Sequence, residues 1–195
     1  MERWDLIAAE RRAFADLIDS LTPEQLASPS LCGEWTVKHV AAHVMVGPTA
    51  SVREVAMAMV RARFSFDRAN TALAEARVGR PVAELTAAMR DHAESHFSPP
   101  GMDWRAPLAD IVIHRRDAAV PLGIEIESSP EVWPIVLDLL VAPKTRKAFG
   151  GAALPAVRLE ATDVDWSHGE EGPVVQATAE SLALALSGRA DLLPG

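Results

Sequence analysis

The sequence predicts a mainly α protein, with a helical bundle over residues 1–145 followed by a small α+β domain over residues 146–195. Two observations favour this division. Apolar residues recur at intervals of three and four through most of the first part, which is typical of amphipathic helices. Near residue 157 the pattern changes to an alternation of apolar and polar residues, which is typical of strands. Hydrophobic residues make up 49% of the 195-residue chain, so a core of useful size is available.

The first helices follow from spacing and capping residues. Residues 4–20 place Ile7, Phe14 and Ile18 on one face. The Thr22-Pro23 pair predicts a cap and a short turn of helix. Thr36 predicts the N-cap of a helix that runs from Val37 past Val44. Helix-forming residues continue to about residue 63, and the sequence leaves open whether one bent helix or two occupy this stretch.

Further helices are expected at three places in the middle of the chain. Residues 81–97 form one that opens at Pro81 and carries His92 and His96 on its apolar stripe. Pro107 opens the next, which runs to Val120 and closes at a Pro-Leu-Gly sequence. Another is expected over residues 130–141.

The last part of the chain reads as two strands and a helix. Residues 157–162 alternate as a strand does, and residues 172–177 are expected to be its partner, joined through an Asp- and Gly-rich turn. Residues 179–187 return to helix, with Gly188 as the C-cap.

Charge and cysteine content exclude several kinds of function. The net charge of −8 argues against nucleic acid as a partner, because phosphate binding requires clustered cations. A local basic cluster at Arg53, Arg61, Arg63 and Arg68 is interpreted as the solvated side of a helix. The single cysteine, Cys32, cannot form an internal disulfide, and no apolar run is long enough to span a bilayer. We therefore predict a cytoplasmic protein without nucleic-acid or membrane partners; a homodimer through an exposed helix face remains open.

Potential metal ligands occur in three pairs spaced four residues apart. Such spacing puts two side chains on one helix face, close enough to reach one ion, while a third ligand comes from a facing helix. The spacing does not choose among the pairs, and a histidine on an apolar face is more often a hydrogen-bonded core residue than a ligand. The three pairs are His39 with His43, His92 with His96, and Asp110 with His114.

Three motifs together resemble a known family. The stretch from Leu31 to His43, reading LCGEWTVKHVAAH, is similar to the helix-2 signature of the mycothiol-dependent maleylpyruvate isomerase family. The stretch from Pro107 to Gly123, PLADIVIHRRDAAVPLG, resembles its helix-4 signature. The C-terminal runs LEATDVDW and SLALALSGR resemble the C-terminal domain of that family. The resemblance covers nearly the whole chain and implies a DinB-like, metal-binding four-helix bundle.

The resemblance implies which residues hold the metal. Carried over by position, the ligands are His43, Asp110 and His114. The family members best known for isomerase activity have Glu where this chain has Asp110, whose side chain is one methylene shorter. The metal is therefore expected nearer the helix that carries Asp110, or bound to Asp110 through water. His39 falls on a polar, non-ligating position.

Two further residues near these motifs have open roles. Asp117 is either an acceptor that orients His114 or a structural residue at the helix end. Cys32 is expected to be a structural, half-buried residue rather than a nucleophile.

Three protein ligands leave a coordination position open, as in catalytic zinc sites. The resemblance implies that this position takes mycothiol, a low-molecular-weight thiol that attacks a small electrophilic substrate in an isomerase or S-transferase reaction. It also implies an arginine near the substrate, for which Arg189 is the nearest match; the competing interpretation is a cation placed beyond a helix C-terminus. A non-catalytic metal-binding, sensor or interaction protein and a metal-dependent hydrolase are the alternatives.

Overall fold

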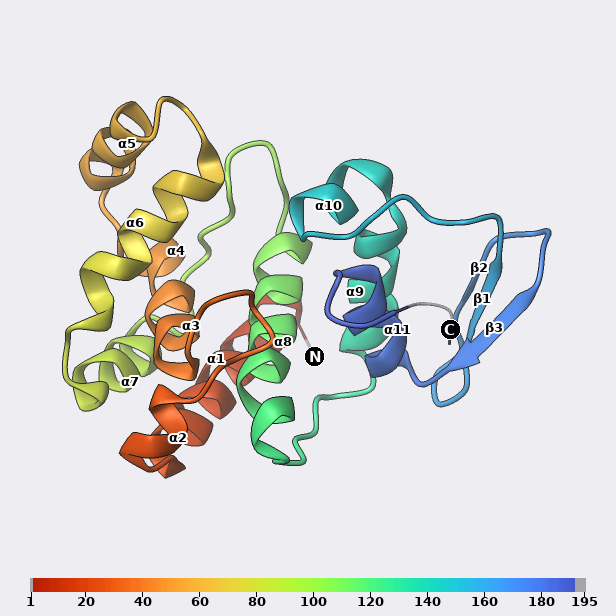
Figure 1. Cartoon of the computed structure of the whole chain (residues 1–195), viewed down its shortest axis with the longest axis horizontal. Helices are drawn as coiled ribbons and strands as arrows, with labels where there is room; N and C mark the ends of the chain where they lie inside the picture. Colours follow the sequence, from red (N-terminus) through yellow and green to blue (C-terminus); the bar gives the residue numbers. More distant parts are fainter. Residues whose placement is uncertain (1, 192–195) are drawn as a thin grey trace. The chain divides into compact units, whose positions relative to one another are not determined.

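The structure is a computed structural model that describes residues 2–191, without the side chain of Asp67, and it confirms the mainly α fold (Figure 1). The chain divides into two compact units, Met1–Ile126 and Glu127–Gly195. No helix in the described part of the chain is both long enough and apolar enough to cross a membrane.

The first unit consists of helices. In chain order they are α1 (Arg3–Ser20), α2 (Pro23–Ala27), α3 (Val37–Val44), α4 (Val46–Thr49), α5 (Val52–Arg61), α6 (Phe66–Val78), α7 (Val82–Asp91) and α8 (Arg105–Ala119), after which residues Val120–Leu122 form a 3₁₀ turn. The pairs α1 with α7, α1 with α8, and α3 with α8 pack side by side, and α6 packs on α3. The helix α8 is buried along nearly its whole length, so its polar side chains lie inside the unit.

The core of this unit follows the predicted spacing. Ile7, Phe14 and Ile18 of α1 are fully buried, as are Leu108 and Val112 of α8. Burying each such side chain contributes about 1.5–3 kcal/mol relative to leaving it in water. The packing of α1 and α3 on α8 therefore holds the polar residues of α8 in fixed positions.

Capping fixes where several helices begin. Thr22 and Thr36 each accept a hydrogen bond from the backbone N–H three residues later, as predicted. The stretch from Val37 to about residue 63 is neither one bent helix nor two, because it contains the three helices α3, α4 and α5. The chain leaves the helical conformation at Ala50, and Ser51 caps α5 with Glu54. The sequence analysis did not predict α6, whose N-cap is Ser65.

One predicted helix is shorter than expected. The helix expected over residues 81–97 ends at Asp91, and His92 is its C-cap residue. His92 and His96 therefore do not lie four residues apart on one helix, and both are exposed. The prediction that they share an apolar stripe is wrong, because the chain leaves the helical conformation before His96.

The second unit combines helices with a small sheet. Its elements are α9 (Val132–Val141), α10 (Pro143–Ala148), β1 (Arg158–Ala161), β2 (Ser167–His168), β3 (Val174–Ala177) and α11 (Ala179–Leu186). The strand order is β2-β1-β3, with β2 antiparallel and β3 parallel to β1. The two predicted strands do pair, but they are parallel because the short strand β2 lies between them in the sequence and occupies the other edge.

The division into units differs from the predicted boundary at residue 145. The helix α9, expected in the bundle, packs on α11 and α10. Its side chains Val132, Val136 and Leu140 are fully buried. Periodicity shows that α9 has an apolar face but does not show which neighbour covers that face, so the sequence gives no basis for assigning α9 to either unit.

Candidate metal centre

Two packed helices bring three potential ligands together in the first unit. His43 lies in the last turn of α3, while Asp110 and His114 lie one turn apart on α8. The Nε2 atom of His114 is 3.4 Å from Oδ1 of Asp110, and the Nε2 atom of His43 is 3.6 Å from the same oxygen. One ligand atom from each of the three residues lies within 4.8 Å of the others. Both imidazoles thus direct a nitrogen toward one carboxylate oxygen.

These separations fit a tetrahedral ion. Ligand atoms about 2.1 Å from a tetrahedral zinc ion are about 3.4 Å from one another, whereas adjacent ligands of an octahedral ion at that bond length are about 3.0 Å apart. The two N–O separations, 3.4 and 3.6 Å, lie nearer to the tetrahedral than to the octahedral value. The shorter side chain of Asp110 therefore reaches both histidines without help from the extra methylene of a Glu.

The three side chains differ in their access to solvent. His43 is 8% exposed and His114 is 7% exposed, while 38% of the Asp110 side chain is exposed. The two imidazoles are enclosed by packing, and the carboxylate marks the side on which the cluster meets solvent. A small molecule approaching the cluster would arrive beside Asp110.

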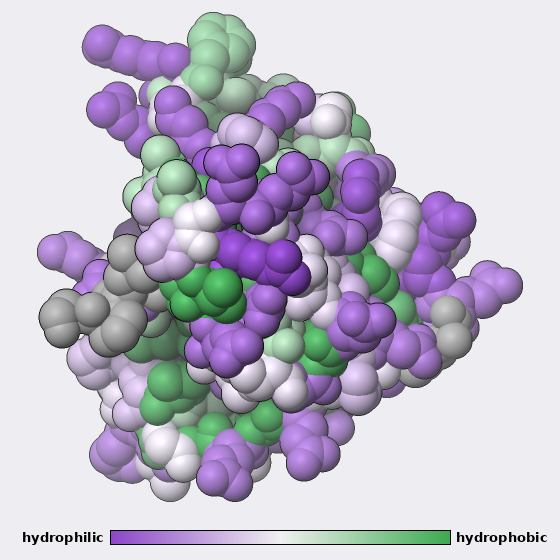
Figure 2. Space-filling view, turned by 90° about the vertical axis from the view of Figure 1, so that its right-hand side faces the viewer, coloured by the Kyte–Doolittle hydropathy of each residue, from purple (hydrophilic) through white to green (hydrophobic). Residues whose placement is uncertain are grey.

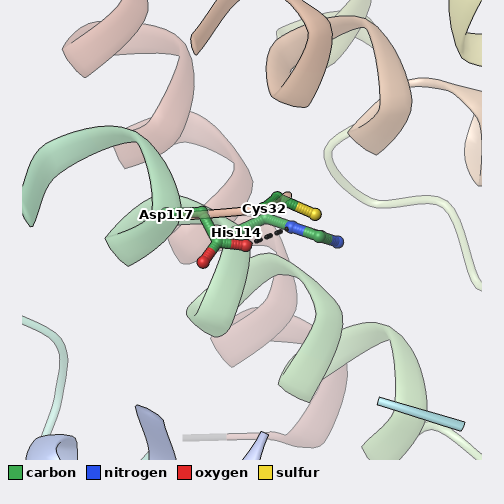
Figure 3. Close-up of side chains that lie close together, drawn as sticks. All are labelled: Cys32, His114 and Asp117. Atoms are coloured by element: carbon green, nitrogen blue, oxygen red, sulfur yellow. Dashed lines mark hydrogen bonds and ion pairs between the residues drawn. The ribbon is translucent and has the colours of Figure 1, made fainter. Parts of the chain in front are cut away.

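The buried carboxylate of Asp117 contacts the imidazole of His114 and orients it (Figure 3). The Nδ1 atom of His114 lies 2.8 Å from Oδ2 of Asp117, whose side chain is fully buried. An ionised carboxylate can only accept, so Nδ1 carries the proton and Nε2 is turned toward Asp110. The structure contains the hydrogen bond on which the acceptor role considered for Asp117 depends. Cys32, half-buried, has its sulfur near the same pair.

The charges in this cluster shift three pKa values. Burial acts to lower the pKa of His114, but the charges and hydrogen bonds of Asp110 and Asp117 outweigh it and raise that pKa to about 10. Burial and the positive charge of His114 lower the pKa of His43. Burial acts to raise the pKa of Asp110, yet the charges and hydrogen bonds of His114 and His43 bring it far below its usual value. The directions of these shifts favour a protonated His114, a neutral His43 and an ionised Asp110 near neutral pH when no metal is bound.

Two residues beside the cluster were missed by the sequence analysis. The ring of Trp35 lies 5.1 Å from the ring of His43, between centroids. Arg11 of α1 is buried, and the charge of Asp110 partly offsets the lowering of the Arg11 pKa by burial. The signal for Arg11 was present, since an arginine on the apolar face of a predicted helix must find buried partners.

Other predicted histidines lie outside this cluster. The Nδ1 atom of His39 is 2.7 Å from the hydroxyl of Thr36, in the cap of α3. The Nδ1 atom of His92 is 3.0 Å from the carbonyl oxygen of Ala88, so this nitrogen donates to it. The ring of His96 stacks on Trp4 with centroids 4.3 Å apart. Each of these three histidines has another role in the structure.

Arg189, the predicted catalytic residue, belongs to the second unit. Its Nη1 atom donates to the carbonyl oxygens of Phe149 at 2.8 Å and Ser187 at 2.7 Å. Phe149 and Ser187 are the C-cap residues of α10 and α11. These bonds are the ones expected of a cation at helix C-termini.

Comparison with known proteins identifies the family. The model of the mycothiol maleylpyruvate isomerase N-terminal domain matches residues 7–119, which are more than half of the chain. The chain belongs to this family. The matched residues include all three members of the cluster on α3 and α8. No curated protein matches the chain.

Two solved structures resemble this member of the mycothiol maleylpyruvate isomerase family. One is a crystal structure of a histidine-to-alanine mutant of the mycothiol-dependent maleylpyruvate isomerase, with a TM-score of 0.55 and 15% identity over 96% of this chain and 88% of that one. The other is a crystal structure of the mycothiol-dependent maleylpyruvate isomerase, with a TM-score of 0.47 and 16% identity over the same shares of the two chains. At such identity the first likeness shows a common fold.

Proposed function

We propose that His43, Asp110 and His114 bind one divalent metal ion, zinc, and that the chain is a metal-dependent enzyme. The observation that carries the proposal is the convergence of the two Nε2 atoms on Oδ1 of Asp110 at 3.4 and 3.6 Å. These separations fit tetrahedral coordination, which zinc adopts readily, and the neutral imidazole and carboxylate are ligands that it accepts. The hydrogen bond from His114 to Asp117 supplies the outer support usual for a ligating histidine.

The family supports mycothiol as the thiol cofactor. A metal held by three protein ligands has a further position for a thiol, whose pKa it lowers so that the reactive thiolate forms near neutral pH. The exposed side chain of Asp110 marks where the thiol and a small electrophilic substrate would enter. The substrate class is that of maleylpyruvate, an unsaturated keto acid, and the reaction is an isomerisation or an S-transfer.

Arg189 and the cytoplasmic location remain part of this proposal. In the proposed reaction the Arg189 guanidinium faces the substrate carboxylate or a developing enolate. Its bonds to two helix-end carbonyls give it a structural role as well. An Arg189→Lys variant retains the cation and loses the planar fork, so a loss of turnover with unchanged stability would favour the catalytic role. Unchanged turnover would leave only the capping role.

The decisive experiment is elemental analysis of the freshly purified protein beside three variants. The expected result is about one zinc per chain in the wild type, with loss in His43→Ala and in His114→Ala. His92→Ala is the matched control, because His92 is exposed and bonds to a backbone carbonyl outside the cluster. Zinc retained in both cluster variants would contradict the ligand assignment.

The thiol step has its own test. The metal-loaded protein is mixed with mycothiol and maleylpyruvate, and the isomer is followed by absorbance; cysteine replaces mycothiol in the control. Turnover that requires both metal and mycothiol supports the enzyme. A full metal site without any turnover would favour the non-catalytic alternative. Isomer formation without a thiol would contradict the role of mycothiol.

A further inference from the structure

The helix α5 and the turn after it expose an unusual number of apolar side chains. Large hydrophobic residues that are at least two-fifths exposed gather within fifteen residues here: Val52 at 87%, Met57 at 42%, Val60 at 64%, Phe64 at 76% and Phe66 at 57%. Most surface apolar residues are scattered singly, and a contiguous set marks an interaction surface. We call these five residues and the arginines around them the α5 surface.

The α5 surface arises because α5 has few neighbours. The helix packs mainly on α6, through the small buried residues Ala58 and Ala62. Val52, Ala56 and Val60 lie four residues apart in one row that faces away from that contact, and all three are exposed. The core of the first unit therefore does not bury these three side chains.

Arginines border the apolar side chains. Arg53 and Arg61 lie on α5, Arg63 lies in the turn and Arg68 lies on α6, all exposed. The one acidic residue of α5, Glu54, caps the helix through Ser51 and lies 3.5 Å from the buried Arg77. A chain with a net charge of −8 thus presents a locally cationic surface here. The sequence analysis took this cluster for an ordinary solvated helix side.

The backbone of the turn holds an aromatic ring in the open. Arg63 and Phe64 both have positive φ angles, 53° and 63°, which are uncommon for residues other than glycine. The turn between α5 and α6 is at the top of Figure 1, and at the top of Figure 2 hydrophobic and hydrophilic side chains project together. These residues form the turn that ends α5, in which the Phe64 N–H donates to the carbonyl oxygen of Met59, and the turn leaves the Phe64 side chain exposed.

We propose that the α5 surface binds an anionic lipid bilayer from one side. An exposed helix with an apolar row, bordering arginines and projecting phenylalanines is the chemistry of interfacial binding, in which the rings enter the boundary between headgroups and acyl chains. The arginines add attraction to anionic headgroups. Pairing of two copies through this face is disfavoured, since antiparallel α5 helices would bring Arg53 of one copy opposite Arg61 of the other. This contact lies on the membrane surface. The proposal therefore departs from the predicted absence of membrane partners, which rested on the lack of an apolar run long enough to span a bilayer.

The test is flotation of the full chain with extruded vesicles, of phosphatidylcholine alone or mixed equally with phosphatidylglycerol. The wild type is expected to float with the anionic vesicles at low salt and to be released at 0.5 M salt. Arg53→Gln with Arg61→Gln lowers the partition coefficient about tenfold or more. Phe64→Asn with Phe66→Gln lowers it comparably. Asparagine tolerates positive φ, so the turn is retained.

A matched control carries the same charge change elsewhere. Lys144→Gln with Lys147→Gln changes two exposed cations of α10, and its partition is expected to stay within about twofold of the wild type. Absence of binding to anionic vesicles, or equal loss in the α10 variant, would overturn the proposal. A wild-type dimer that the Phe64 and Phe66 changes convert to a monomer, without vesicle binding, would assign the surface to self-association instead.

Discussion

The imidazole Nδ1 atom of His114 lies 2.8 Å from Oδ2 of the fully buried Asp117, three residues later on the same helix. This bond fixes which nitrogen of His114 faces Asp110 and His43. The contact is local in sequence, yet its effect reaches a residue of another helix, because α3 packs on α8 at this point. The orientation of a proposed ligand thus depends on a group that does not itself face the cluster.

Replacing Asp117 with Asn is expected to lower zinc affinity about 10- to 100-fold. The amide has the same shape but no charge, so it holds the Nδ1 proton less firmly. Competition with a chromophoric chelator measures the change. Asp138→Asn is the control, because Asp138 accepts a 2.9 Å bond from Trp166 in the second unit. Equal zinc affinity in Asp117→Asn and wild type would remove the positioning role.

Zinc binding is expected to release about one proton at pH 8. His114 is protonated in the metal-free protein up to its pKa of about 10, while His43 is already neutral because its pKa is lowered. Zinc must displace the His114 proton, so affinity rises about tenfold per pH unit below that pKa. Calorimetry in two buffers of different ionisation enthalpy counts the proton. Affinity that stays constant between pH 7 and 9 would contradict this.

The same shift predicts how the stability of the metal-free protein depends on pH. The folded pKa of His114, about 10, lies above the unfolded value of about 6.5. A raised folded pKa contributes stability that is fully present below about pH 6.5 and is lost as the pH rises toward 10. Urea denaturation of the chelator-treated protein at pH 6, 8 and 10 measures this loss. Asp117→Asn should show a smaller decline.

Arg11 is expected to be a main structural cation of the first unit. Its Nη1 atom donates to the carbonyl oxygens of Ala93 at 2.9 Å and Ser95 at 2.8 Å, just beyond α7. Arg11→Met leaves these acceptors without a buried partner and is expected to reduce the free energy of unfolding by about 2–4 kcal/mol. Arg12→Met is the control: Arg12 makes an exposed pair with Glu94, worth about 1 kcal/mol or less. Equal losses of unfolding free energy in Arg11→Met and Arg12→Met would contradict the prediction.

Gly172 is expected to be intolerant of any side chain. Its φ is +100°, and a Cβ there would lie 2.2 Å from the carbonyl oxygen of Ala156. Gly172→Ala is therefore expected to destabilise the second unit by about 2–4 kcal/mol, measured by chemical denaturation. At Gly150, also at positive φ, the nearest backbone atom would be 3.4 Å away, so Gly150→Ala should cost about 1 kcal/mol. If Gly150→Ala destabilised the second unit more than Gly172→Ala, the backbone at Gly172 would be able to relax around a side chain.

The sequence by itself determined the features that depend on neighbours along the chain. The positions of α1, α3, α8 and α9 followed from apolar spacing, although α6 was not predicted. The N-caps at Thr22 and Thr36 followed from residue type, because capping is completed within one turn. The pairing of Asp110 with His114 on one face followed in the same way. Spacing left open which of the three pairs of potential ligands binds the metal. The family resemblance selected His43 as the third ligand.

Only the tertiary structure decided what depends on contacts between distant segments. Periodicity placed His92 and His96 on an apolar stripe as readily as it placed Asp110 and His114 on one face, but the end of α7 at Asp91 separates the first pair. The parallel pairing of β1 with β3 and the packing of α9 on α11 were likewise not predictable from local pattern. A local pattern specifies that a face is apolar, and only the packed chain specifies what covers it, because that choice is made by the free energy of the whole core.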